Sequence, residues 1–233
     1  MIAVIQCAAR KRERYLTMQD GKRVVFVAQP ALAPPRDGFV YARPDDPSGS
    51  ERSWREELVA YNRTPAVNPQ RLLPAFELYA HNAYRRVAER FGIENTYILS
   101  AGWGLIAASF LTPYYDITFS AAADAFKRRR KSDSYHDLCM MPGDVDEPVV
   151  FFGGKDYLPL FCELTRSVRS KRIVFYNSAQ APSAPGCSIV RFNTATRTNW
   201  HYECVEAILA GRLGDCISPS RTHSQSGEWL SDP

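Results

Sequence analysis

Short apolar runs alternate with segments of helical spacing along this 233-residue chain. Each run has about five residues, the usual length of a buried strand. The runs lie at 2–6, 24–28, 96–100, 148–152, 172–176 and 188–192. Helices are expected at 53–61, 71–91, 120–131, 157–168 and 198–209. This alternation predicts an α/β fold with a mostly parallel central sheet flanked by helices.

A single domain is expected over residues 1–214, because no linker or internal repeat divides this part of the chain. Residues 215–233 are polar and predict a flexible C-terminal tail. The Pro-rich segment 29–50 predicts a surface loop. There is no apolar run long enough to span a membrane and no signal-peptide pattern at the N-terminus, so we expect a cytoplasmic protein without membrane contact.

Small or polar residues follow four of the expected strands. Since the carboxyl ends of parallel strands meet at one edge of a sheet, we expect a shared cleft there. Small residues let a ligand approach the backbone amides. The base-binding candidates are Gln6, Cys7, Ser100, Gly102, Trp103, Gly104, Gly153, Gly154 and Ser178, with Asn177 beside them as a catalytic candidate. Trp103 could offer a stacking surface, or its ring could pack in the core. Cys7 could be a nucleophile at a strand end, or a small buried thiol.

A carboxylate stands next to two tyrosines shortly after the glycine turn. Tyr114, Tyr115 and Asp116 belong to the segment Leu-Thr-Pro-Tyr-Tyr-Asp-Ile at 111–117. Asp116 is a candidate for acid/base or cation-stabilising chemistry, and the tyrosines are candidates for base binding. The alternative is a structural carboxylate that accepts hydrogen bonds from backbone amides.

Basic residues gather in two places, although the net charge is only +4. The chain has 23 Arg and 6 Lys. The planar guanidinium group of Arg binds phosphate with two parallel hydrogen bonds. The expected phosphate contacts are Arg10, Lys11, Arg12 and Arg14 in one cluster and Lys127, Arg128, Arg129, Arg130 and Lys131 in the other. A solvated surface and arginine-rich codon usage are the alternatives.

Metal chemistry has no support in the pattern of potential ligands. The six cysteines are scattered without a CxxC pair, and the four histidines form no HxxxH or HExxH motif. We therefore expect no metal and no other cofactor. Disulfides are also not expected in a cytoplasmic chain.

The segment Tyr-Ile-Leu-Ser-Ala-Gly-Trp-Gly-Leu-Ile at 97–106, followed by Leu-Thr-Pro-Tyr-Tyr-Asp, resembles the central motif of the YaaA-like families. There, a strand ending in Leu-Ser precedes a small residue, a Gly-Leu pair and a Pro-Tyr. Further islands at 4–11, 77–86 and 152–157 are similar to elements of shorter YaaA relatives. The chain departs from the pattern at Trp103, where relatives carry a smaller aromatic or His, and in segment 29–50, which has no counterpart. The resemblance implies a nucleic-acid partner, because YaaA proteins are associated with DNA binding and peroxide stress, and some relatives accompany enzymes of modified guanine bases.

Together, these features predict an enzyme that removes a modified or damaged base from double-stranded DNA by cleaving its N-glycosidic bond, in phage defence or DNA repair. The base would flip into the cleft. Asn177 and the amides of residues 102–104 would read its edge and stabilise the leaving base. Asp116 would position water or stabilise an oxocarbenium-like sugar. Two alternatives remain open: a non-catalytic DNA-binding stress-response protein, in which Asp116 is structural, and an enzyme of free nucleosides or nucleotides.

Overall fold

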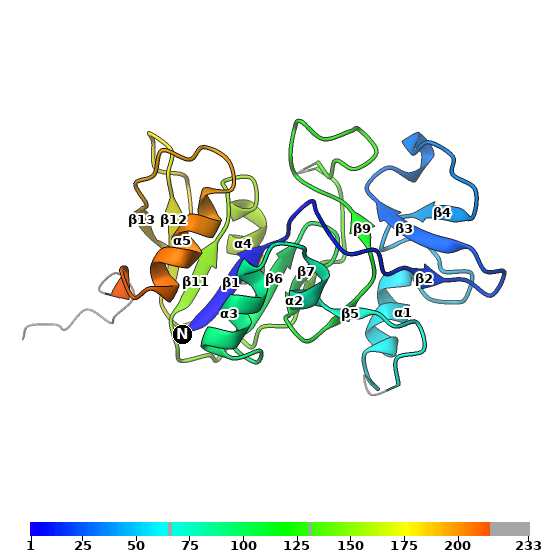
Figure 1. Ribbon diagram of the computed structural model, residues 1–233, viewed down its shortest axis with the longest axis horizontal. Coiled ribbons are helices and arrows are strands. Elements are labelled where there is room, and N and C mark those ends of the chain that lie inside the picture. Colours follow the sequence, from blue (N-terminus) through cyan, green and yellow to red (C-terminus); the bar gives the residue numbers. More distant parts are fainter. Residues whose placement is uncertain (65–66, 131, 215–233) are drawn as a thin grey trace, which may run out of the picture.

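The computed structural model describes residues 1–64, 67–130 and 132–214 and centres on a seven-stranded sheet (Figure 1). The strand order is β10-β7-β6-β1-β11-β12-β13. The strands are β1 (Ile2–Gln6), β6 (Thr96–Ser100), β7 (Gly104–Ala107), β10 (Leu138–Cys139), β11 (Val149–Phe152), β12 (Arg172–Tyr176) and β13 (Ser188–Arg191). The strands from β6 to β13 in this order are parallel, whereas β7 pairs antiparallel with β6 and β10 lies parallel to β7. The predicted α/β fold with a mostly parallel sheet is confirmed.

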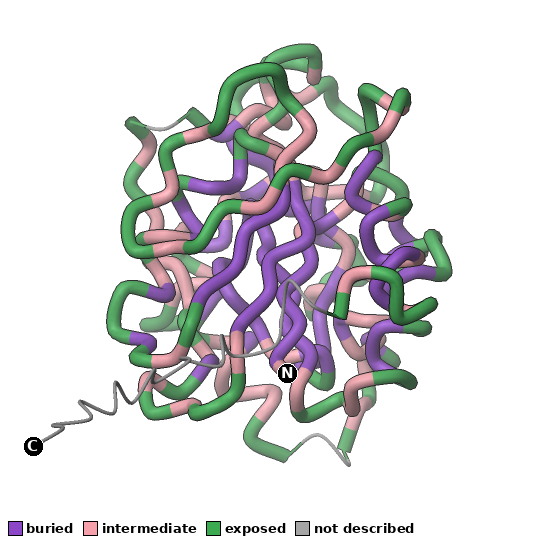
Figure 2. The backbone as a smooth tube through the Cα atoms, turned by 90° about the vertical axis from the view of Figure 1, so that its left-hand side faces the viewer, coloured by how far each residue is buried: buried purple, intermediate pink, exposed green. Residues whose placement is uncertain are grey.

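Helices cover both faces of this sheet. In Figure 1, α3 (Ala83–Phe91) and α5 (Trp200–Leu209) lie in front of it, and α4 (Leu158–Leu164) lies behind it. On the α4 side, the rings of Phe151 and Phe161 stack with their centroids 4.6 Å apart. A sheet covered on both faces needs strands that are apolar throughout, and the central strands in Figure 2 are buried along almost their whole length.

A second, smaller sheet lies beside the first. Its middle strand β3 (Arg23–Val27) pairs antiparallel with β2 (Leu16–Thr17) and parallel with β4 (Phe39–Ala42) and β9 (Tyr115–Asp116). One cluster of buried apolar side chains includes residues of both sheets, and Phe26 of β3 meets the Trp103 ring edge-on at 4.9 Å. The expected loop 29–50 therefore holds β4 and a 3-10 turn, Pro30–Leu32.

The helix α1 (Trp54–Tyr61) begins where the sequence predicts. Ser53 caps it by accepting a hydrogen bond from the Glu56 amide, and the Glu56 carboxylate accepts one from the Ser53 amide in return. This helix carries Arg55 into the core between the two sheets. The Arg55 guanidinium pairs with Asp45 and donates hydrogen bonds to the carbonyls of Gly102 and Trp103.

Two predicted helices are wrong. The segment 71–91 is divided into β5 (Leu73–Pro74), α2 (Ala75–Leu78) and α3, and β5 pairs antiparallel with β8 (Leu111–Thr112). The helix stops at Tyr79 because that residue adopts extended dihedral angles and forms a bridge with Lys11. Residues 120–130 contain turns instead of a helix, and a bridge between Thr118 and Arg128 closes this loop.

The predicted tail, residues 215–233, lies outside the described residues. Within the described ranges, no helix combines the length and the apolar character that crossing a membrane requires.

Candidate active site

A cavity of about 700 Å³ opens at the carboxyl edge of the large sheet. The chain leaves β1 toward β6 on one side, whereas it leaves β11 toward β12 on the other side. Neighbouring parallel strands whose connections diverge in this way leave a crevice where ligands bind. The cavity lies at this position, between the residues that follow β1, β11 and β12, the loop after β9 and the start of α5.

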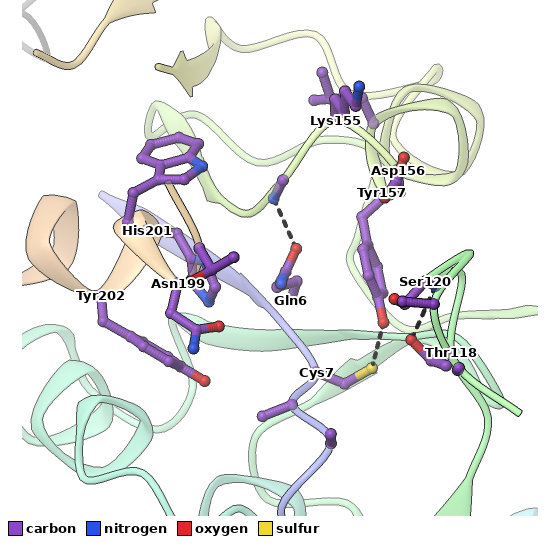
Figure 3. A pocket seen from close by; sticks show the side chains of 18 of the residues that line it. Gln6, Cys7, Thr118, Ser120, Lys155, Asp156, Tyr157, Asn199, His201 and Tyr202 are labelled. Atoms are coloured by element: carbon purple, nitrogen blue, oxygen red, sulfur yellow. Dashed lines mark hydrogen bonds between the residues drawn. The ribbon is translucent and has the colours of Figure 1, made fainter. Parts of the chain in front are cut away.

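Hydrogen bonds between the strand ends shape the cavity floor (Figure 3). The Gln6 side chain accepts a hydrogen bond from the Gly154 amide at 2.7 Å, which ties the end of β1 to the turn after β11. Cys7 Sγ lies 3.2 Å from the Tyr157 hydroxyl. Burial raises the pKa of the Tyr157 phenol well above its usual value, so this group is a neutral hydrogen-bonding partner.

Asp116 lines the cavity from the end of β9, in the small sheet. The Lys127 ammonium lies 3.2 Å from the Asp116 carboxylate and 2.9 Å from the Asp124 carboxylate. Hydrogen bonds to Asp124 and Asp116 raise the pKa of Lys127, which therefore stays protonated and holds Asp116 in place. A fixed carboxylate of this kind can stabilise positive charge that develops on a bound molecule.

Lys11 also lines the cavity, with its side chain buried. Its ammonium lies 4.1 Å from the centre of the Tyr115 ring. Burial lowers the pKa of Lys11, and the nearby Cys7 and Asp116 oppose this shift.

The opposite wall comes from the start of α5 and from the end of β12. Figure 3 shows Asn199, His201 and Tyr202 on this side. The His201 side chain is 3% exposed, and its Nε2 atom has no hydrogen-bond partner. Burial and the neighbouring His81 lower the pKa of His201 to about 4, so its imidazole is neutral at pH 7. Asn177 lines this wall, and its side-chain amide donates to the Thr196 carbonyl at 2.9 Å.

The structure gathers three of the four predicted strand ends. Gln6 and Cys7, Gly154, and Asn177 and Ser178 all line the cavity, as do Asp116, Lys11 and Lys127. The fourth strand end, with Ser100, Gly102, Trp103 and Gly104, is buried and is not part of the cavity wall. The same holds for Tyr115 and Gly153, and Tyr114, which is partly buried, also lies outside the cavity wall.

The predicted stacking role of Trp103 is corrected by its burial. Its ring is 0% exposed and packs edge-on against Phe26 and Tyr115. The turn around it is occupied by internal contacts: Ser100 Oγ accepts hydrogen bonds from the amides of Gly102 and Trp103, and donates one to the Tyr115 hydroxyl. The amides of Gly102 and Trp103 are therefore bound within the chain, and cannot stabilise a leaving base.

Two of the glycines serve packing. A Cβ on Gly153 would lie 2.2 Å from the Phe151 ring, so this position needs glycine for the β11 turn to close. Gly104 has φ +90°, and a Cβ there would lie 2.4 Å from the Leu138 carbonyl oxygen. The small size of these two residues is thus explained by packing within the chain and does not indicate a bound ligand.

The second basic cluster does not form one phosphate-binding surface. Arg129 is buried, pairs with Asp137 and donates to the Ala101 carbonyl. Arg128 donates to the Ala121 carbonyl at 3.1 Å. Arg130 is exposed, and Lys131 lies outside the described residues. In the first cluster, Arg10, Arg12 and Arg14 are exposed and flank the buried Lys11.

Several cavity residues were not singled out as site candidates from the sequence: Thr118, Lys155, Asp156, Tyr157, Arg197, Asn199, His201 and Tyr202. The rule that ligands collect beyond strand ends could have found those after residue 192, where the last expected strand ends. Thr118 is carried to the site by the pairing of β9 with β3, which no local pattern reveals. Among the residues that the structure describes, no group of three or more potential ligands could hold a metal ion.

No protein-family model, curated protein or solved structure matches this chain. The resemblance to the YaaA-like families thus stays a prediction from the motifs. The function must be inferred from the cavity itself.

Proposed function

We propose that the protein cleaves the N-glycosidic bond of a modified or damaged base in DNA, and that the flipped nucleotide occupies the cavity. The observation that carries this proposal is the meeting of Asp116, Asn177 and Lys11 in one cavity at the switch point of the sheet. Its volume of about 700 Å³ suits a base with its sugar. An extruded nucleotide needs such a pocket, because the reacting bond is inaccessible within a duplex.

The cavity walls provide groups for both parts of the nucleotide. Tyr176 lines it, is partly exposed and supplies a ring surface for a base, whereas the Tyr202 ring already stacks on His81. The Asn177 side chain lines the cavity and supplies a polar contact for the edge of the base.

Asp116 would act on the sugar. Bond cleavage leaves positive charge on C1′ and O4′ of an oxocarbenium-like sugar, and a fixed carboxylate beside it lowers the barrier. Lys127 holds Asp116 in position through their 3.2 Å contact. In this proposal, Arg10, Arg12 and Arg14 bind phosphates beside the cavity mouth, since all three are exposed and flank Lys11 in the chain.

The direct test is base release. The purified protein is incubated with duplexes that each carry one oxidised, alkylated, deaminated or hypermodified base, and abasic sites and free bases are measured. We expect release from at least one duplex and none from the unmodified control. A complete absence of release across the panel would contradict the proposal.

A second candidate is an enzyme of free nucleosides or nucleotides that uses the same cavity. Arg128 and Arg129 favour this candidate, because both form contacts within the chain. Less basic surface is therefore left to bind a duplex. Lys155 and Arg197 line the cavity and could bind a terminal phosphate. Release of base from free nucleotides, without DNA affinity that falls steeply with salt, would support this candidate.

A further inference from the structure

Lys11 differs from Lys127, its neighbour on the cavity wall. Lys127 is held by two carboxylates. In the described residues, by contrast, Lys11 has neither a carboxylate within ion-pair distance nor a hydrogen-bond acceptor. Its side chain is 9% exposed and lines the cavity. A buried lysine without an ion pair is costly for stability, and its persistence at a cavity points to a chemical use of the amine.

On one side, the Lys11 amine faces two tyrosine rings that carry no charge and are held in place by hydrogen bonds. Its Nζ lies 4.1 Å from the Tyr115 ring centre and 5.9 Å from that of Tyr79. The two tyrosine hydroxyls lie 2.7 Å apart, and Ser100 donates a hydrogen bond to Tyr115. Burial raises the pKa of both phenols well above their usual value, so they offer ring faces and no phenolate partner.

The backbone fixes the position of Lys11 relative to these rings. Lys11 and Tyr79 form an antiparallel bridge. On either side of it, the Arg12 amide donates to the Leu78 carbonyl at 2.7 Å, and the Ala80 amide donates to the Arg10 carbonyl at 3.1 Å. The segment after β1 is thereby clamped to the end of α2, which holds the amine at the cavity wall.

The charge state of Lys11 favours nucleophilic chemistry. Burial is the largest influence and lowers the pKa of its ammonium. The other groups that act on it are Cys7 and Asp116, which raise this pKa, and the Lys127 ammonium, which lowers it. A lysine desolvated in this way presents more of its neutral amine, which is the form that attacks carbon.

We propose that Lys11 is an amine nucleophile that forms a Schiff base with C1′ of a 2-deoxyribose, so that the protein also cleaves the strand at an abasic site. The inference rests on the proposed function for its substrate class, a sugar in DNA. It assigns Lys11 a covalent role in place of the phosphate contact that the sequence suggests.

The covalent steps balance without a cofactor. The Nζ lone pair forms a bond to C1′ as the C1′–N bond breaks, and the base leaves with that electron pair and with a proton from Nζ. The nitrogen lone pair then forms the C1′=N bond, the C1′–O4′ bond breaks, and O4′ takes a proton from solvent. Loss of a C2′ proton expels the 3′ phosphate with its bonding electrons. Water finally hydrolyses the imine and restores the amine.

A DNA duplex with a preformed abasic site tests Lys11 independently of base recognition, because its sugar carries no base and its ring form is in equilibrium with an open C1′ aldehyde. The full chain is incubated with this duplex and sodium cyanoborohydride, which reduces an imine to a stable amine. We expect a covalent protein–DNA adduct, and peptide mapping by mass spectrometry should place it on Lys11. No adduct, or an adduct only on another amine such as the N-terminus, would overturn the inference.

Variants sharpen the test. Lys11→Arg keeps a cation and Lys11→Met keeps the stem, and both should lose the adduct while they retain the circular dichroism spectrum of the native chain. Lys22→Met is the matched control, since Lys22 is exposed and pairs with Asp20 outside the cavity, and it should trap DNA as the native chain does. If the Lys11 variants do not fold, the mapped adduct of the native chain decides alone.

The two proposals fail in different ways. An adduct on Lys11 without base release from any modified duplex would support the lyase chemistry and contradict the proposed function. Base release without any trapped adduct would support the proposed function and overturn the role of Lys11.

Discussion

Asp116 and Asp124 bind the same ammonium, yet only Asp116 is placed on a strand, at the end of β9. We expect Asp116→Asn to slow base release about 10²- to 10³-fold, because a neutral amide cannot stabilise a cationic sugar. DNA affinity should persist, since the phosphate contacts remain. Single-turnover rates of abasic-site formation measure the effect.

Asp124→Asn is the matched control for this prediction. It removes a carboxylate from the same lysine but leaves the pair of Asp116 and Lys127 intact. Its rate should fall far less. Equal losses in the two variants would mean that Lys127, and not Asp116, is the group that matters.

Cys162 and Cys187 form a second residue-scale feature, with their Sγ atoms 4.0 Å apart. The hydrogen bond from Cys162 lowers the pKa of Cys187 to about 7, and Arg172 contributes in the same direction. By contrast, burial raises the pKa of Cys139. We therefore expect iodoacetamide to modify Cys187 before Cys139 at pH 7. Because about half of Cys187 is then thiolate, its alkylation rate should be about half of the rate that it reaches at high pH.

The pH profile and one variant check this prediction. The alkylation rate of Cys187 should fall below pH 7 and level off above about pH 8. Cys162→Ala removes the hydrogen-bond donor, so it should raise the pKa of Cys187 and slow its reaction at pH 7. Faster modification of Cys139 than of Cys187 in mass-spectrometric time courses would contradict the assignment.

At the scale of elements, Gly104 allows β7 to begin beside β10. Gly104 and Gly49 both have φ near +90°. A Cβ at Gly104 would collide with the Leu138 backbone, whereas a Cβ at Gly49 would point into open space. Gly49→Ala should cost about 1–2 kcal/mol of unfolding free energy from backbone strain alone. Gly104→Ala should cost clearly more, because the β7–β10 pairing must shift. Urea unfolding of both variants measures the difference.

The elements that the sequence predicted correctly are those with a local cause. β1, β6, β11 and β12 are apolar runs, and α1 has a capping box. The single helix predicted at 71–91 fails because its break depends on the pairing of Tyr79 with Lys11, which are 68 positions apart in the sequence. For a similar reason, the sequence could not distinguish a stacking role of Trp103 from a ring packed in the core. Its burial depends on contacts such as that with Phe26, which belongs to another sheet.

At the scale of the whole molecule, the site is predictable to the extent that it follows from the parallel sheet. Gln6, Gly154 and Asn177 meet because parallel strands end at one edge. Asp116 reaches the same cavity only through the pairing of β9 with β3 in the small sheet. Such pairing between distant segments leaves no periodic signal in the sequence.

Buried His201 couples the stability of the whole molecule to pH. Its pKa is lowered to about 4 in the folded chain, against about 6.5 in an unfolded chain. The unfolded state therefore binds a proton first as the pH falls. The stabilising effect is complete above about pH 6.5, is lost progressively down to about pH 4, and amounts to about 3 kcal/mol.

We expect His201→Gln to reduce the loss of unfolding free energy between pH 7 and pH 4 by about this amount. Urea titrations at several pH values measure it. His136→Gln is the control for the loss of a histidine from the surface, because the His136 side chain is 87% exposed. An identical slope for His201→Gln and the native chain would rule out His201 as the source.

The charge distribution of the molecule makes a last prediction about DNA. If Arg10, Arg12 and Arg14 each neutralise one phosphate, the triple Gln variant should reduce the slope of log affinity against log salt by about 3, at about 0.9 per contact. Arg90→Gln is the matched control, since this exposed residue lies at the end of α3 that leads into β6, at the opposite edge of the sheet. An unchanged slope in the triple variant would exclude this cluster from the duplex interface. A native chain without salt-dependent affinity would instead favour a free nucleotide as the substrate, because the cavity needs no basic surface around it to bind a single nucleotide.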